Sequence, residues 1–160
     1  MVYFTADMHF GHRAIINMQN RPFESVEEMD RILLQNFNSV VRQNDTVYIL
    51  GDICHHMKVE DADNLIRKMN GKKYLIVGNH DKKYDPRLFE DIKDFMKISV
   101  DGRNLALMHY PMLSWPKKSS GGYQLHHYPG HTSIDVMSEN TLYKHLPLTD
   151  VIEHVVTTHK

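Results

Sequence analysis

Short apolar runs in this chain alternate with longer segments whose apolar residues recur at helical spacing. A run of consecutive apolar residues without a polar face is typical of a strand buried on both sides. We expect such strands at Val2–Ala6, Thr46–Leu50 and Tyr74–Val77. The segments between them predict helices at Arg13–Met18, from about Val26 to Arg42, and around Val59–Met69. This alternation of strands and helices predicts a parallel βαβαβ core.

The helix beginning near Val26 has the clearest local signals. Ser25 and Glu28 stand at the two positions of a capping box. The apolar residues that follow lie on one helical face: Met29, Ile32, Leu33 and Phe37.

The second half of the chain has a different pattern. Asp101–Gly102 separates Phe95–Val100 from Asn104–His109 and predicts a type I′ hairpin. Antiparallel strands are therefore expected beside the parallel core. After an exposed loop come two further strands and a closing helix, expected at Tyr123–His127, about Ser133–Met137 and about Asp150–Val156.

Polar residues with catalytic potential follow five of the expected strands. They are Asp7 and His9, then Gly51-Asp52, then Gly78-Asn79-His80-Asp81, then His109, and finally Gly130-His131. Ligands of open α/β sheets gather beyond the carboxyl ends of the strands, so we expect these residues to converge on one site.

The composition is that of one soluble domain covering residues 1–160, with 41% hydrophobic residues and no apolar run long enough for a membrane span. The amino terminus enters a strand directly, without the regions of a signal peptide, and Cys54 is the single cysteine. We therefore expect a cytoplasmic protein without disulfides or a cysteine zinc cluster. The net charge of -1 and the scattered basic residues do not favour tight binding to duplex nucleic acid.

The candidate ligands combine two carboxylates, one amide oxygen and three imidazoles: Asp7, His9, Asp52, Asn79, His109 and His131. This mixture suits borderline divalent ions and exceeds what one ion needs, so it predicts two ions. A water between two such ions can attack phosphorus in line. His80 would protonate the leaving oxygen, with Asp81 orienting its ring.

In their order and their strand-end positions, these motifs resemble those of the calcineurin-like metallophosphoesterases, in particular the small single-domain members of bacteria and phages. The resemblance implies an α/β fold, a four-layer αββα sandwich with two mixed β-sheets. It also implies a dinuclear metal centre, with manganese first and iron, zinc or nickel as alternatives, that hydrolyses phosphate monoesters or diesters. By motif, Asp7 and His9 bind one ion, Asp52 bridges both, and Asn79, His109 and His131 bind the other, with His80 left for catalysis.

One motif departs from the family pattern. The last motif of the family usually reads Gly-His-x-His, and this chain has Ser133 in place of the second histidine. His126, His127 or a water fills that position, or one ion binds weakly; the sequence leaves these alternatives open.

Other histidines allow more than one interpretation. His12 and Arg13 are candidates for substrate phosphate, with a solvated loop as the alternative, and His55 and His56 are expected at the surface. The expected substrate is a phosphorylated small molecule or a nucleotide-like compound. Two alternatives share the fold: an interaction scaffold with a weak metal site, and a nuclease. The natural substrate and the oligomeric state are not indicated by the sequence.

Overall fold

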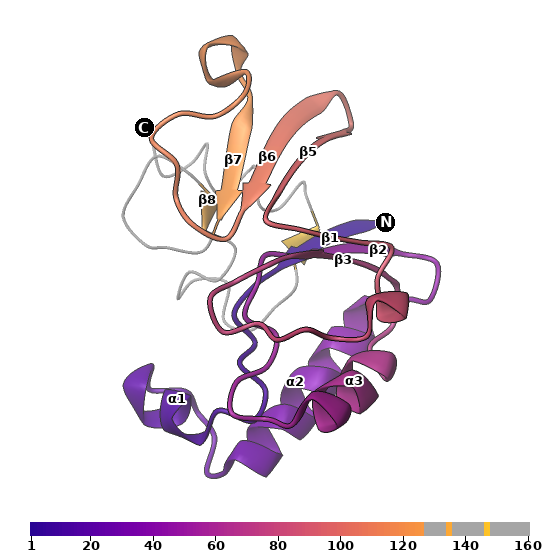
Figure 1. Cartoon of the computed structure of the whole chain (residues 1–160), viewed down its shortest axis with the longest axis vertical. Coiled ribbons are helices and arrows are strands. Elements are labelled where there is room, and N and C mark those ends of the chain that lie inside the picture. The colour runs from indigo at the N-terminus through magenta and orange to yellow at the C-terminus, as the bar shows by residue number, and fades with distance from the viewer. Residues whose placement is uncertain (127–133, 136–145, 148–160) are drawn as a thin grey trace.

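Two β-sheets stacked face to face form the centre of the molecule in the computed structural model, which describes residues 1–126, 134–135 and 146–147 (Figure 1). The first sheet has the order β4-β3-β2-β1-β9. Its strands are β1 (Val2–Thr5), β2 (Thr46–Ile49), β3 (Lys72–Ile76), β4 (Asp91–Lys93) and β9 (Leu146–Pro147). Strands β1 to β4 are parallel and β9 is antiparallel to β1, so the sheet is mixed.

The second sheet has the order β5-β6-β7-β8 and is also mixed. Its strands are β5 (Phe95–Val100), β6 (Arg103–Met108), β7 (Tyr123–His126) and β8 (Ile134–Asp135). Strands β5 and β6 are antiparallel, and the pairs β6–β7 and β7–β8 are parallel. Asp101 and Gly102 both have positive φ, 49° and 75°, as the predicted type I′ turn requires.

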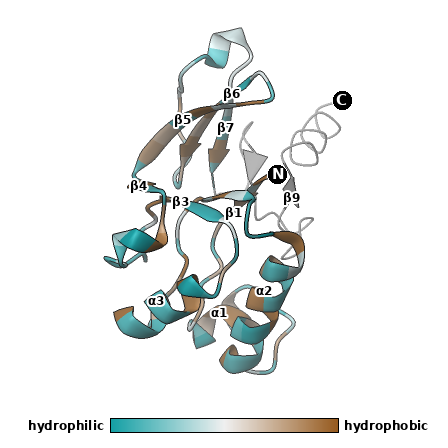
Figure 2. Ribbon diagram, turned by 90° about the vertical axis from the view of Figure 1, so that its right-hand side faces the viewer, coloured by the Kyte–Doolittle hydropathy of each residue, from teal (hydrophilic) through white to brown (hydrophobic). Residues whose placement is uncertain are grey.

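Three helices lie on the face of the first sheet that points away from the second sheet (Figure 2). They are α1 (Arg13–Met18), α2 (Val26–Val40) and α3 (Val59–Arg67); two short 3₁₀ turns, η1 (Pro86–Leu88) and η2 (Lys118–Ser120), lie in loops. The predicted N-cap is confirmed, because the Ser25 hydroxyl accepts a hydrogen bond from the amide of Glu28 at 3.1 Å. Helix α2 ends two residues before the predicted Arg42, since Val41 is already extended while its side chain stays buried.

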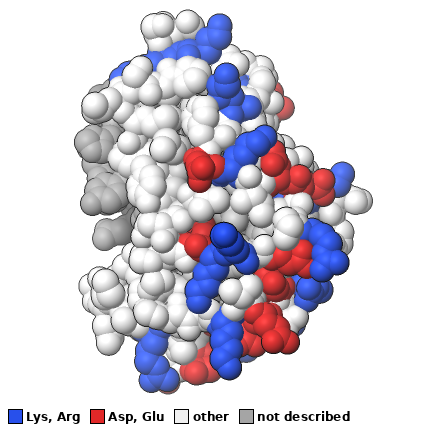
Figure 3. Space-filling model, viewed as in Figure 1, with Lys and Arg blue, Asp and Glu red and all other residues white. Residues whose placement is uncertain are grey.

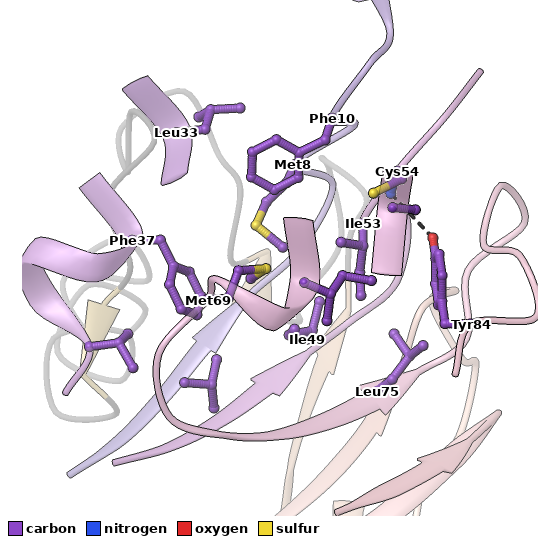
Figure 4. Close-up of a cluster of buried hydrophobic side chains, with 14 of the residues drawn as sticks. Met8, Phe10, Leu33, Phe37, Ile49, Ile53, Cys54, Met69, Leu75 and Tyr84 are labelled. Carbon is purple, nitrogen blue, oxygen red and sulfur yellow. Dashed lines mark hydrogen bonds between the residues drawn. The ribbon is translucent and has the colours of Figure 1, made fainter. Parts of the chain in front are cut away.

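The strands of the first sheet are buried on both faces, which explains their uninterrupted apolar sequences. On one face, Phe37 of α2 and Met69 after α3 lie against Ile49 and Leu75 of the sheet (Figure 4). On the other face, the sheets share a second core made by Phe4, Ala6, Leu50, Ile76, Met96, Leu105, Leu107 and Leu125. Successive residues of one strand thus serve different cores.

The predicted fold class is confirmed: the chain is an α/β protein with two mixed sheets. Strands β4 and β9 were not predicted, because three residues and two residues are too few for a periodic pattern. The strand expected at about Ser133–Met137 is the shorter β8. The closing helix expected at about Asp150–Val156 lies outside the described residues. Among the helices that are described, none has the length and apolar character needed to cross a membrane.

Candidate metal centre

Four of the five expected strand ends meet at one place in the structure. Asp7 and His9 follow β1, Asp52 follows β2, Asn79 and His80 follow β3, and His109 follows β6. The side chains of Asp7, His9, Asp52 and His109 are buried. Ligand atoms of Asp7, His9 and Asp52 all lie within 4.8 Å of one another, a spacing that could hold a metal ion. The fifth strand end carries His131, which lies outside the described residues together with Ser133, so the question raised by the last motif stays open.

The Asp52 carboxylate lies at the middle of this group. Its Oδ2 is 3.6 Å from Nε2 of His9, 3.8 Å from Nε2 of His109 and 4.0 Å from Nε2 of His80. Its Oδ1 accepts a hydrogen bond from the His80 amide at 2.8 Å. Oδ1 is therefore held by the backbone, while Oδ2 faces imidazoles from three different strand ends. A carboxylate that bridges two metal ions needs such a position.

Three of the candidate ligands have left-handed backbone conformations. The φ angles are 50° at Asp7, 52° at His9 and 55° at Asp52. Such conformations cost non-glycine residues about 1 to 3 kcal/mol each and concentrate at functional sites. The strain turns successive side chains of the strand-end loops toward the same point, and it supports a functional role for all three residues.

Two glycines let the strand ends approach one another. A Cβ on Gly51, where φ is 89°, would lie 2.5 Å from Nδ1 of His109 and 2.7 Å from the backbone of Gly78. A Cβ on Gly78 would overlap the Asp52 carboxylate. The glycines before Asp52 and Asn79 are thus required by close packing of backbone and ligands.

The Asp81 carboxylate braces this packing. It accepts hydrogen bonds from the amides of Asp52 and Gly78, each at 2.8 Å, and from the amide of Ile53 at 2.9 Å. The Tyr84 hydroxyl donates a fourth bond at 2.9 Å. The sequence predicts that Asp81 orients the ring of His80; in the structure the hydrogen bonds of its carboxylate hold the loop that carries Asp52.

Hydrogen bonding fixes the orientation of His109. Its Nδ1 lies 2.7 Å from the carbonyl oxygen of Leu50, so Nδ1 carries the hydrogen and donates it. Its Nε2 lies 3.1 Å from Oδ1 of Asn79, so an imidazole nitrogen and an amide oxygen that can both coordinate a cation lie side by side.

The donor set therefore fits the metal pair that the sequence predicts. The carboxylate and imidazole donors Asp7, His9, Asp52 and His109 are buried, the amide of Asn79 lies at an exposed position beside them, and the described donors include no thiolate. Asp7 and His9 lie on one side of Asp52, with an Asp7 Oδ1 to His9 Nε2 distance of 3.4 Å. His109 and Asn79 lie together at 3.1 Å, and Asp52 reaches both pairs.

A second group of histidines adjoins the first. Ligand atoms of His12, His55 and His56 all lie within 4.8 Å of one another. The expectation that His55 and His56 are both surface residues is only half right: His56 is exposed, but His55 is half-buried and its ring centroid lies 4.1 Å from that of His80. Burial, followed by the neighbouring His80 and His12, lowers the pKa of His55 to about 4. Burial likewise lowers the pKa of His12, and Arg13 is exposed at the start of α1.

Sequence reasoning missed two residues that hold the site together. The buried Arg21 donates to the carbonyl oxygens of Asp7 at 2.9 Å and Met8 at 2.8 Å, which fixes the loop after β1. Both oxygens of Asp30 accept a hydrogen bond from the Gly11 amide at 3.0 Å. Arg21 lies between α1 and α2, and Asp30 lies within α2. No motif marks either residue in the sequence, because each one contacts a loop that only the folded chain brings close.

Stacked mixed sheets with carboxylates and imidazoles gathered at their strand ends define the metallophosphatase class of α/β proteins. A sequence profile described as calcineurin-like phosphoesterase matches residues 1–159, and the chain belongs to this family. Membership supports metal-dependent hydrolysis of phosphate esters as the general class of activity.

The chain is also similar to individual proteins of known sequence or structure. The chain is 38% identical over 132 residues to an uncharacterized protein of Methanocaldococcus jannaschii, covering 81% of this chain and 70% of the relative. It is 41% identical over 81 residues to the Gene 66 protein of Mycobacterium phage L5, covering 49% of this chain and 39% of the phage protein. The crystal structure of the Aquifex aeolicus protein of unknown function AQ665 has a TM-score of 0.74 at 24% identity, covering 96% of this chain and 98% of that one, which shows the shared fold.

Proposed function

We propose that this protein hydrolyses phosphate esters at a pair of divalent metal ions, with manganese as the first candidate. The observation that carries the proposal is the position of Asp52 Oδ2, within 4.0 Å of imidazole nitrogens from three strand ends. A purely structural carboxylate would be satisfied by one or two partners, whereas this one is surrounded by donors that two ions could share.

The residues divide between the two ions around Asp52. Asp7 and His9 would hold one ion, and Asn79 and His109 the other, with His131 assigned to the second ion by its motif alone. When bound, two divalent ions would polarise the phosphoryl group and acidify the attacking water. The protein's own contribution is to hold the donors rigidly through Asp81, Arg21 and the two glycines.

His80 has the position of a proton donor. Its side chain is 37% exposed while Asp7, His9, Asp52 and His109 are buried, so it can reach a substrate as well as the centre. Its Nε2 lies 4.0 Å from Asp52 Oδ2, which places the ring beside the proposed metal pair. His80 would then hold a proton at Nε2 and deliver it to the leaving oxygen.

The charge distribution favours a small substrate. On the face shown in Figure 3, basic and acidic side chains are interspersed, with no extended field of one sign. A phosphorylated small molecule or nucleotide-like compound fits this surface better than duplex nucleic acid, which needs a basic track. The exposed Arg13 beside His12 is our candidate for a contact with substrate phosphate.

The proposal is tested by hydrolysis of an aryl phosphodiester and an aryl phosphomonoester by protein reconstituted with Mn²⁺. We expect His80→Ala to lower turnover by about 10² or more while the metal content stays unchanged, because general acid catalysis contributes on that scale. We expect Asp52→Asn to lose metal and turnover together. Lys97→Ala, at an exposed position of β5, serves as the control. Full turnover in the His80 variant would remove its assigned role.

The same experiment addresses the interaction scaffold. A protein that binds no metal after reconstitution and hydrolyses neither ester would have the fold without the activity. A nuclease would instead cleave short oligonucleotides, with binding that weakens steeply as salt rises.

A further inference from the structure

We propose that His12, His55 and His56 form a third metal site, of the zinc type, next to the centre described above. This site goes beyond the proposed function, which uses none of the three histidines as a metal ligand. The ligand atoms of the three residues all lie within 4.8 Å of one another. Their ring centroids are 4.3 Å apart for His12 and His55, 5.3 Å for His12 and His56, and 3.9 Å for His55 and His56.

Backbone contacts between two loops bring these histidines together without help from an ion. The Phe10 amide donates to the Ile53 carbonyl at 2.9 Å, and the His55 amide donates to the Phe10 carbonyl at 2.9 Å. Phe10 and Cys54 form a parallel bridge between the same loops. The residues that follow, His12 on one loop and His55 and His56 on the other, are therefore presented side by side. A preformed arrangement of this kind lowers the entropy cost of binding.

The unpartnered nitrogen Nδ1 of His12 is evidence that the three-histidine group binds a ligand. His12 is only 8% exposed, and its Nδ1 has no hydrogen-bond partner in the part of the chain that the structure describes. A buried polar atom without a partner is costly, and such atoms are uncommon in native proteins. Coordination of an ion by the three-histidine group would account for keeping a histidine at this position.

The chemistry of the donors favours zinc over manganese. The group offers three imidazoles and no carboxylate. Imidazole nitrogen suits Zn²⁺, whereas Mn²⁺ prefers carboxylate and water oxygens. Three histidine ligands around Zn²⁺ leave one coordination position open, as in catalytic zinc sites. Because neutral ligands leave the charge of the ion in place, the open position would favour an anionic oxygen.

The site would lie beside the residues of the proposed metal pair. The ring centroid of His12 is 5.4 Å from that of His9, and the centroid of His55 is 4.1 Å from that of His80. An ion held by the three-histidine group would therefore place a further positive charge close to where a substrate phosphate reaches His80.

The experiment measures zinc in a background where the first centre is disabled. Purified Asp52→Asn protein is equilibrated with Zn²⁺ alone, freed of unbound metal and subjected to elemental analysis. We expect that adding His55→Ala and His56→Ala to this background removes one zinc ion per chain. These two residues are chosen because they are less buried than His12, and circular dichroism verifies that the variants fold. Adding Lys97→Ala, at an exposed position of β5, instead should leave the zinc content unchanged.

Substitution with Co²⁺ gives an independent readout. We expect the Asp52→Asn protein to show the intense visible absorption of tetrahedral Co²⁺, and the variant without His55 and His56 to lose it. Equal zinc content with and without these two histidines would overturn the third site. More than one zinc ion per chain in Asp52→Asn would instead count against Asp52 as a metal ligand. Failure of the third site and failure of the proposed metal pair therefore give different results.

Discussion

Two groups of ligand-bearing side chains lie next to each other in this protein and differ in chemistry. The first is centred on Asp52 and combines carboxylates with imidazoles, all buried. The second, the three-histidine group, contains only imidazoles and ranges from the buried His12 to the exposed His56. The loops after β1 and β2 supply residues to both groups. Neighbouring positions on one scaffold can thus favour different metals, because donor type and exposure change within a few residues.

The two groups are also held in place to different degrees. Around Asp52, the Asp81 carboxylate accepts four hydrogen bonds, and Gly51 and Gly78 allow close contact. The loop that carries His12 is held by backbone bonds of Phe10 and, at Gly11, by the carboxylate of Asp30. Substitutions at these supports test the difference, and we expect larger effects around Asp52.

The largest effect is expected for Gly51→Ala. The new methyl group would lie 2.5 Å from His109 and would also disfavour the left-handed backbone at φ 89°. Overpacking and backbone strain together predict a loss of about 3 to 5 kcal/mol in the free energy of unfolding. Urea denaturation measures this loss, and Mn²⁺ binding should weaken in the protein that remains folded.

Gly102→Ala is the matched control. Gly102 also has positive φ, 75°, but a Cβ there would meet nothing within 4 Å. Only the cost of a left-handed backbone remains, so we expect a loss of about 1 to 2 kcal/mol in the free energy of unfolding. Equal losses for the two variants would show that close packing at Gly51 contributes nothing.

A smaller effect is expected for Asp81→Ala, which removes the acceptor of four hydrogen bonds. We expect a loss of about 3 kcal/mol in the free energy of unfolding, since water replaces part of what is lost. Asp81→Asn keeps one acceptor oxygen and should lose about half as much. Urea denaturation and Mn²⁺ titration measure both variants. Wild-type stability in Asp81→Ala would contradict the bracing role.

The smallest effect concerns pH and the support of the three-histidine group. Burial raises the pKa of Asp30 from its ordinary value of 3.8 to about 6. The folded protein then binds this proton more tightly than the unfolded chain, so the free energy of unfolding falls as pH rises between about 4 and 6. Because the carboxylate is partly solvated, we expect this contribution to be about 1 kcal/mol.

Asp30→Asn removes the titrating group and should flatten this part of the stability profile. Urea denaturation at pH 4, 5, 6 and 7 compares the two proteins, with the pH values chosen around the pKa near 6. A profile for Asp30→Asn as steep as that of the wild type would assign the pH dependence to other groups.

The sequence predicted that the candidate ligands Asp7, His9 and Asp52 gather at one place, because strand ends are local features. Asp52 follows a glycine after an apolar run, and parallel strands place such ends at one edge of the sheet. The predicted hairpin was confirmed for the same reason, since Asp101–Gly102 specifies its turn locally.

Contacts made across the fold could not be predicted in this way. Nothing near Asp81 in the sequence indicates that its oxygens accept amides from Asp52 and Ile53. The proximity of His12 to His55 depends on the bridge between Phe10 and Cys54, which joins residues from two loops. Such pairings depend on how β1 and β2 align, which is a property of the whole sheet.

The central claim is that paired metal ions held around Asp52 make this protein a phosphoesterase. The most direct test is to titrate metal-free protein with Mn²⁺ and to follow bound metal and aryl phosphodiester hydrolysis in the same samples. We predict that hydrolysis rises with about two bound Mn²⁺ per chain, as expected for a two-metal site, and that Asp52→Asn loses both. Hydrolysis that is independent of bound metal, or metal binding and hydrolysis that persist in Asp52→Asn, would contradict it.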